Sequence, residues 1–300
     1  MNIINNLIIK SLPLIPKILI KVFSKKYVAG ITNQEALSVI KKINFNQQSA
    51  TIDILGEHTS TNQEADEITN NYLQLLDEIK KNDLNCNLSI KPSHIGADIS
   101  YPTVLKNFIN ITEKAKKLNN FIRIDMENSD MTDMTINLYN DLNKTFSNIG
   151  IVFQAYLYRT NKDIAKLKNG SNIRLCKGIY NESDKISYNN YNQINENFLN
   201  LLKIAFEKDI YVGIATHDKK LISAIINLIE KMNLSNNKFE FQYLHGVPMD
   251  DMIMDYKNRG FKTRAYVPFG QNWYDYSIRR IKENPKIASY VLKNVFTKIR

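Results

Sequence analysis

The fold class is decided by one stretch, FIRIDMENSDMTDMTINLYNDLNKTFSNIGIVFQAYL (Phe121–Leu157). It begins with a short run rich in β-branched and aromatic residues, Phe121–Asp125, which predicts a strand. Apolar residues at helical spacing then predict a helix over Met131–Phe146, and the run Gly150–Leu157 predicts a second strand. This order of elements is typical of α/β proteins with a parallel sheet.

The same alternation recurs on both sides of this stretch. The other predicted strands are Ala50–Leu55, Asn87–Lys91, Asn172–Cys176, Ile210–Ala215, Phe239–Leu244 and Lys262–Val267. The other predicted helices are Thr61–Lys81, Tyr101–Leu118, Gln193–Glu207, Lys219–Lys231 and Asp250–Lys257. Eight strands alternating with helices favour a distorted, TIM-like (β/α)8 barrel over a six-stranded doubly wound sheet. We expect the barrel over residues 46–300 and an added helical segment over residues 1–45.

Composition narrows the function class. The 300 residues are 43% hydrophobic and 23% charged, which is typical of a globular protein, and the net charge is +10. Such a charge favours an anionic partner, substrate or cofactor, but no basic run interleaved with aromatic residues predicts nucleic-acid binding. Cys86 and Cys176 lie far apart without CxxC spacing, which indicates a reducing, cytoplasmic compartment.

The N-terminal segment Leu7–Phe23 is apolar but interrupted by lysines and prolines, so it is too short for a spanning helix and lacks a signal-peptide pattern. Lys10, Lys17 and Lys21 share one helical face, opposite a stripe of Ile and Leu. Two interpretations stay open: an interfacial helix on the inner face of the cell membrane, or a helix packed on the barrel with its lysines outward. The second is favoured.

Reactive side chains gather at the predicted strand ends, the face where barrel enzymes build their active sites. They are Lys91, Asp125, Glu127, Gln154, Arg174, Lys177, Thr216, His217, His245 and Tyr266. Arg174 and Lys177 suit an anion, although rim cations in salt bridges fit equally well, and Lys177 could also form a Schiff base. Asp125 and Glu127 could act as acid–base groups or cap the next helix. No HxH, HExxH, GxGxxG or P-loop pattern occurs, so we expect no metal and no Rossmann or P-loop nucleotide site.

A last helix after the eighth strand carries Tyr276, Arg279, Arg280 and Glu283 at positions i, i+3, i+4 and i+7. These side chains project within an arc of roughly 100°. Two guanidiniums on one stripe can hold a carboxylate bidentately, which suits an amino or keto acid, but the spacing alone fits a solvated helix face better. The position of this helix on the rim of the barrel favours the binding site.

In this order, a set of phrases closely resembles the proline dehydrogenase family, most of all its short monofunctional bacterial members. The phrases are SIKPS (Ser89–Ser93), RIDMENSDMT (Arg123–Thr132), FQAYLYRT (Phe153–Thr160), RLCKGIY (Arg174–Tyr180), ATHD (Ala215–Asp218), FEFQYLHG (Phe239–Gly246) and YVPFGQNWYDYSIRR (Tyr266–Arg280). The resemblance implies non-covalent FAD and oxidation of L-proline to Δ1-pyrroline-5-carboxylate, the first step of proline catabolism to glutamate, by hydride transfer from proline C5 to flavin N5. It also implies a membrane quinone as the electron acceptor, and leaves a pyrroline-5-carboxylate dehydrogenase partner open.

The resemblance also implies roles for individual residues. Arg279 and Arg280 match the pair that grips the substrate carboxylate, and Lys91 matches a substrate-site lysine that pairs with Glu283. The catalytic positions are Asp125 and Arg174, the latter near flavin N5. The walls around the proline ring are Tyr266, Tyr276, Tyr180 and Leu175. The flavin-contacting positions are Met126, Gln154, Lys177, Gly178, Ile179, Thr216 and His217.

Two departures from the family pattern stand out: Pro92 follows Lys91, and Ile179 replaces a usual alanine. The rival functions are a Schiff-base lyase or aldolase that uses Lys177 or Lys91, and a non-catalytic relative that binds a membrane or an anion. The complete set of site residues favours the dehydrogenase.

Overall fold

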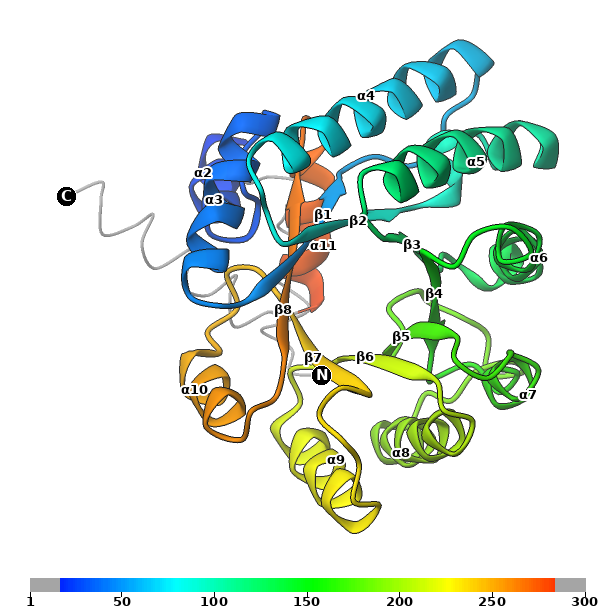
Figure 1. Cartoon of the computed structure of the whole chain (residues 1–300), viewed down its shortest axis with the longest axis vertical. Helices are drawn as coiled ribbons and strands as arrows, with labels where there is room; N and C mark the ends of the chain where they lie inside the picture. The colour runs from blue at the N-terminus through cyan, green and yellow to red at the C-terminus, as the bar shows by residue number, and fades with distance from the viewer. Residues whose placement is uncertain (1–16, 284–300) are drawn as a thin grey trace.

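The computed structural model describes residues 17–283 as a ring of strands with helices around it (Figure 1). The strands are β1 Ser49–Ile54, β2 Cys86–Ile90, β3 Ile122–Ile124, β4 Ile149–Gln154, β5 Asn172–Cys176, β6 Tyr211–Ala215, β7 Phe239–Leu244 and β8 Thr263–Phe269. The helices are α2 Lys17–Tyr27, α3 Asn33–Phe45, α4 Asn62–Lys81, α5 Tyr101–Lys117, α6 Thr132–Leu142, α7 Thr160–Ala165, α8 Tyr191–Glu207, α9 Lys219–Lys231, α10 Asp250–Asn258 and α11 Trp273–Glu283. Short 3₁₀ turns η2 and η3 cover Pro92–Ile95 and Ser129–Met131.

The strands form a closed parallel barrel in chain order, β1 to β8, and β8 pairs back onto β1. The predicted (β/α)8 barrel is therefore confirmed. Closure leaves no free sheet edge, and the parallel order places every strand's carboxyl end on the same face of the barrel.

The two faces of each strand differ in chemistry. In β5, Ile173 and Leu175 are fully buried in the apolar layer between strands and helices, while Arg174 contacts residues of other strands inside the barrel. Side chains alternate along a strand, so an apolar outer face and a polar inner face follow from the same short run. The barrel interior is consequently a network of polar and charged groups.

The main differences from the sequence prediction occur around β4. We expected a strand to Leu157, but β4 ends at Gln154 because the chain then turns, with Thr160 Oγ1 donating to the Gln154 carbonyl at 2.7 Å. The helix α7 was not predicted, because six residues are too few to show an apolar period.

The first described helices pack on the barrel. A capping box starts α3, in which Thr32 and Glu35 satisfy each other's backbone N–H groups, and α3 packs against β1 and β8. Helix α2 packs against α11; its Ile20 is fully buried, while Lys17 and Lys21 are exposed. This arrangement supports the packed-helix interpretation for residues 17–27. Lys10 lies outside the described residues, and the division at residue 45 stays a prediction.

No helix among the described residues is long and apolar enough to cross a membrane.

Candidate active site

Buried charges at the carboxyl ends of β1, β2, β3 and β8 form one cluster. Lys91, just after β2, donates from Nζ to Asp53 Oδ2 at 3.0 Å, and both side chains are largely buried. The Tyr266 hydroxyl lies 2.8 Å from the same Asp53 oxygen and 3.0 Å from Asp125 Oδ2. A phenol has one hydrogen to donate, so it can serve only one carboxylate at a time. The two aspartates and Tyr266 therefore form a cluster that can accept a further proton.

Arg174 contacts this cluster from inside the barrel through hydrogen bonds. Its Nη1 donates to Asp125 Oδ1 at 2.8 Å and to Ser89 Oγ at 3.1 Å, and its Nε donates to Gln242 Oε1 at 2.6 Å. The guanidinium carbon lies 5.0 Å from the centre of the Tyr266 ring. These bonds fix the guanidinium in a plane and orient the Asp125 carboxylate.

Burial and the surrounding charges together keep Lys91 protonated and charged, and keep Tyr266 protonated and neutral. Burial raises the pKa of Asp53, Lys91 opposes that rise, and Asp125 adds to it. Burial lowers the pKa of Lys91, but Asp53 and Asp125 more than offset this and the net pKa is raised. Burial and the two aspartates raise the pKa of Tyr266, which therefore stays a phenol near neutrality. An ammonium held in this way is a poor Schiff-base nucleophile, which weighs against the lyase reading for Lys91.

A second group lies after β4, β5 and β6. Lys177 Nζ is 2.5 Å from Asp218 Oδ2 and 4.6 Å from the centre of the Tyr191 ring. His217 Nε2 accepts a hydrogen bond from the Leu244 N–H at 3.0 Å, which requires an unprotonated nitrogen. Burial, with Arg280 nearby, lowers the pKa of His217 to about 4. His217 is therefore neutral, and Lys177 is an ion-paired ammonium.

Two features of this second group suit a bound amide-bearing ring. Gln154 is buried, its Nε2 donates to the Glu127 carbonyl at 3.2 Å, and its Oε1 has no partner among the described residues. Gly178 has φ +111°, and a Cβ there would lie 2.2 Å from Tyr156 Cδ1. The backbone after β5 can thus take a turn open only to glycine. Thr216, which directly follows β6, and Met126, two residues after β3, are also buried.

Helix α11 brings an aromatic residue and a cation to the same region. Tyr276 is buried, and the guanidinium carbon of Arg280 lies 5.2 Å from the centre of its ring. Arg280 contributes to the lowered pKa of His217, so this helix lies close to the carboxyl end of β6. The side chains of Arg279 and Glu283 lie outside the described part of the chain. Among the described residues Lys91 pairs with Asp53, and its expected pairing with Glu283 stays a prediction.

The side chain of Leu175 faces away from the barrel interior, and its assigned role stays a prediction. Leu175 was expected to line the substrate ring, but it is fully buried in the apolar layer outside the strands, because β5 turns Arg174 inward and so turns its neighbour outward. Leu244, on the same face of β7 as Gln242, is a partly exposed aliphatic side chain at the carboxyl end of its strand. Tyr180 is partly buried, and Ile179 is 48% exposed, so the departure at Ile179 leaves its side chain largely outside.

Asp53 was missed by sequence reasoning, although a signal was present. In SATIDI the alternation of β1 places Asp53 on the face of Thr51, so a charged residue occupies the inner position at the carboxyl end of the strand. Glu127, by contrast, bonds the Ser93 N–H at 2.9 Å and its hydroxyl at 2.5 Å, which supports a structural role. Among the described residues, no group of three or more His, Cys, Asp or Glu side chains could hold a metal ion.

Comparison with known proteins gives a consistent result. The family model described as "Proline dehydrogenase" matches residues 36–293. The chain is 33% identical over 276 residues to "Proline dehydrogenase 1" of Bacillus subtilis, covering 92% of this chain and 91% of that protein. It is 28% identical to "Proline dehydrogenase" of Deinococcus radiodurans, covering 91% of this chain and 89% of that protein. The barrel also resembles a crystal structure of proline utilization A from Bdellovibrio bacteriovorus, with a TM-score of 0.82 and 24% identity over 88% of this chain and 33% of that one.

Proposed function

The chain belongs to the proline dehydrogenase family, and from this premise we propose that it oxidises L-proline to Δ1-pyrroline-5-carboxylate with non-covalently bound FAD. The observation that carries the proposal is the buried cluster of Lys91, Asp53, Asp125 and Tyr266, held by Arg174. The same barrel end carries the cations and aromatic rings that a small zwitterionic ring requires.

The residues present fit a flavin. The unpartnered oxygen of Gln154 can accept a ring N–H, and the turn at Gly178 allows close approach of the backbone. Arg174 and Lys177 supply positive charge beside a ring that becomes anionic on reduction. Thr216, His217, Met126 and Ile179 complete the positions that we assign to the cofactor. When bound, FAD accepts the hydride and stores the electron pair.

The chain's own residues bind the substrate and move its proton. We assign the carboxylate to Arg279 and Arg280, which a planar guanidinium pair can hold bidentately. The cationic site favours loss of the proton from the ring nitrogen, because a second positive charge there is repelled by Lys91 and Arg174. Asp125 and Asp53 can take up that proton through Tyr266. Tyr276 and Tyr180 cover the ring, orient C5 and exclude water.

A spectroscopic experiment tests the proposal. Purified protein should show a flavin spectrum that L-proline bleaches under anaerobic conditions. Arg280→Met should weaken proline binding by roughly 2–5 kcal/mol, as for one removed partner of a buried charge pair, while the oxidised flavin spectrum is unchanged. Lys231→Met, at the end of α9, changes net charge equally and serves as the control. A colourless protein, or bleaching at normal proline concentrations in Arg280→Met, would contradict the assignment.

The fate of the electrons and the product belongs to the same proposal. We assign a membrane quinone as acceptor, reached by peripheral contact of an otherwise cytoplasmic protein with the inner face of the membrane. A pyrroline-5-carboxylate dehydrogenase would consume the product, since the relative named "Bifunctional protein PutA" of Escherichia coli matches over 90% of this chain but only 24% of its own length. Turnover with quinone-containing vesicles, compared with a soluble dye, measures the acceptor directly.

A further inference from the structure

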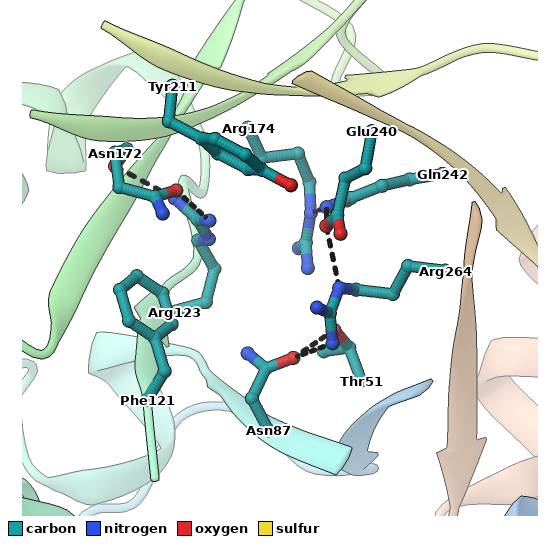
Figure 2. A pocket seen from close by; sticks show the side chains of 10 residues that line it. All are labelled: Thr51, Asn87, Phe121, Arg123, Asn172, Arg174, Tyr211, Glu240, Gln242 and Arg264. Atoms are coloured by element: carbon teal, nitrogen blue, oxygen red, sulfur yellow. Dashed lines mark hydrogen bonds and ion pairs between the residues drawn. The ribbon is translucent and has the colours of Figure 1, made fainter. Parts of the chain in front are cut away.

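The barrel interior contains a polar cavity toward the amino-terminal ends of the strands, opposite to the end that carries the candidate active site. Its volume is about 240 Å³. It is lined by Thr51, Asn87, Phe121, Arg123, Asn172, Arg174, Tyr211, Glu240, Gln242 and Arg264. Most of these lie at or near the amino-terminal starts of their strands. Figure 2 shows that the side chains of Arg123, Arg174 and Arg264 extend into this same space from three directions.

Two of the three guanidiniums have a carboxylate partner. Arg264 Nε lies 2.6 Å from Glu240 Oε1, and Arg174 is paired with Asp125 on its other side. Arg123 is different. It donates to the carbonyls of Ile151 and Asn172, and no carboxylate among the described residues lies within ion-pair distance of it. Three guanidiniums against two carboxylates leave one positive charge without a counter-charge.

This leftover charge is deeply buried. Arg123 is only 3% exposed, and its Nε has no hydrogen-bond partner among the described residues. Burial lowers the pKa of Arg123 to about 9; Arg174 and Arg264 add to that effect, whereas Glu240 and Asp125 oppose it, and the group is still charged near neutrality. A buried charge without an ion-paired counter-charge is costly even when its N–H groups are hydrogen-bonded, so a site of this kind is stabilised by an anion.

The chain is arranged to keep Arg123 in place. A Cβ at Gly150, the inner position of β4 beside it, would lie 2.3 Å from Arg123 Nη1. Asn172 Oδ1 accepts from Nη2 at 2.5 Å, and the guanidinium lies 5.0 Å from the centre of the Phe121 ring. Because Phe121, Asn172, Tyr211 and Arg264 are each partly exposed, the space is accessible at the amino-terminal end of the barrel.

We propose that this space is a binding site for a small monoanion of the halide class, held by Arg123 with Arg264 and the Asn87 and Asn172 amides around it. One negative charge balances the count, and guanidinium and amide N–H groups are the donors that such anions take. The layer of Arg174 and Asp125 separates this site from the candidate active site.

The test compares sodium chloride and sodium bromide with sodium gluconate at equal ionic strength, using the purified full chain with its cofactor. Halide at ten times its dissociation constant should raise the melting temperature by about 2–4 °C relative to gluconate. Asn172→Asp keeps the shape of the side chain but supplies the missing carboxylate to Arg123. It should lower halide affinity ~100-fold or more.

Asn140→Asp, on the exposed face of α6, makes the same chemical change away from the cavity and should keep the wild-type halide response. Crystals soaked in bromide should give an anomalous peak beside Arg123, a readout that does not depend on any variant folding. Equal melting temperatures in halide and gluconate, an unchanged halide response in Asn172→Asp, or a cavity that holds only water in bromide would each overturn the site. None of these measurements involves proline, so they fail or succeed separately from the proposed activity.

Discussion

The two ends of the barrel interior both contain buried cations and carboxylates, but their charges are balanced differently. At the carboxyl end, Lys91 has a buried carboxylate partner, and the aspartates share Tyr266. At the amino end, Arg123 is left with carbonyl and amide oxygens alone. Arg174 belongs to both, since it bonds Gln242 on one side and Asp125 on the other. At the carboxyl end, the charged groups have partners that can exchange protons, which suits proton transfer. At the amino end, the unbalanced charge of Arg123 favours a bound anion.

The largest effect is expected when the link between the two ends is removed. Arg174→Met leaves Asp125 buried without its ion pair, so the free energy of unfolding should fall by about 3–5 kcal/mol. Bleaching of the flavin by proline should also be lost. Urea unfolding and anaerobic titration measure the two effects, with Arg174→Lys as a control that keeps the charge but lacks the planar fork. Wild-type stability in Arg174→Met would show that the ends are independent.

A somewhat smaller effect is expected from the carboxyl end alone. Asp53→Asn removes the negative charge that pairs with Lys91 while Asp125 still lies near, so we expect a loss of about 3 kcal/mol in the free energy of unfolding. Proline oxidation should slow, because Tyr266 loses one of its two carboxylates. Asp209→Asn, an exposed aspartate that pairs with Lys238, is the control and should change stability by less than ~1 kcal/mol. Equal losses in both variants would contradict a special role for the buried pair.

The smallest effect on the free energy of unfolding is expected from His94, a neutral histidine near Lys91 at the carboxyl end of the barrel. Burial and Lys91 lower the pKa of His94 to about 3, from 6.5. The unfolded chain binds its proton first, so this contribution is complete above pH 6.5 and is lost as the pH falls toward 3. The slope is roughly 1.4 kcal/mol per pH unit. The difference in urea midpoint between wild type and His94→Asn should therefore shrink between pH 7 and pH 5, and a constant difference would mean that His94 is not held neutral.

Much of the site could be predicted because it depends on local pattern. The strand ends were predicted within a few residues, and with them the rim positions Lys91, Asp125, Gln154, Arg174 and Tyr266. A resemblance of phrases does not say which side of a strand a residue faces, whereas strict alternation from Arg174 predicts that Leu175 faces outward. Helix α7 could not be predicted, since its six residues show no period.

The sequence by itself determined the barrel, the polar inner faces and the residues at its rim, because the periods of strands and helices and the chemistry of the motifs are local properties. The tertiary structure alone decided the partners. Lys91 meets Asp53 across 38 residues, and Arg123 meets Asn172 across 49. Which inner faces meet depends on the register around the closed ring, and the balance of charge at each end follows from that register. The ion pair of Lys91 and the unbalanced charge of Arg123 therefore arise only when the barrel closes.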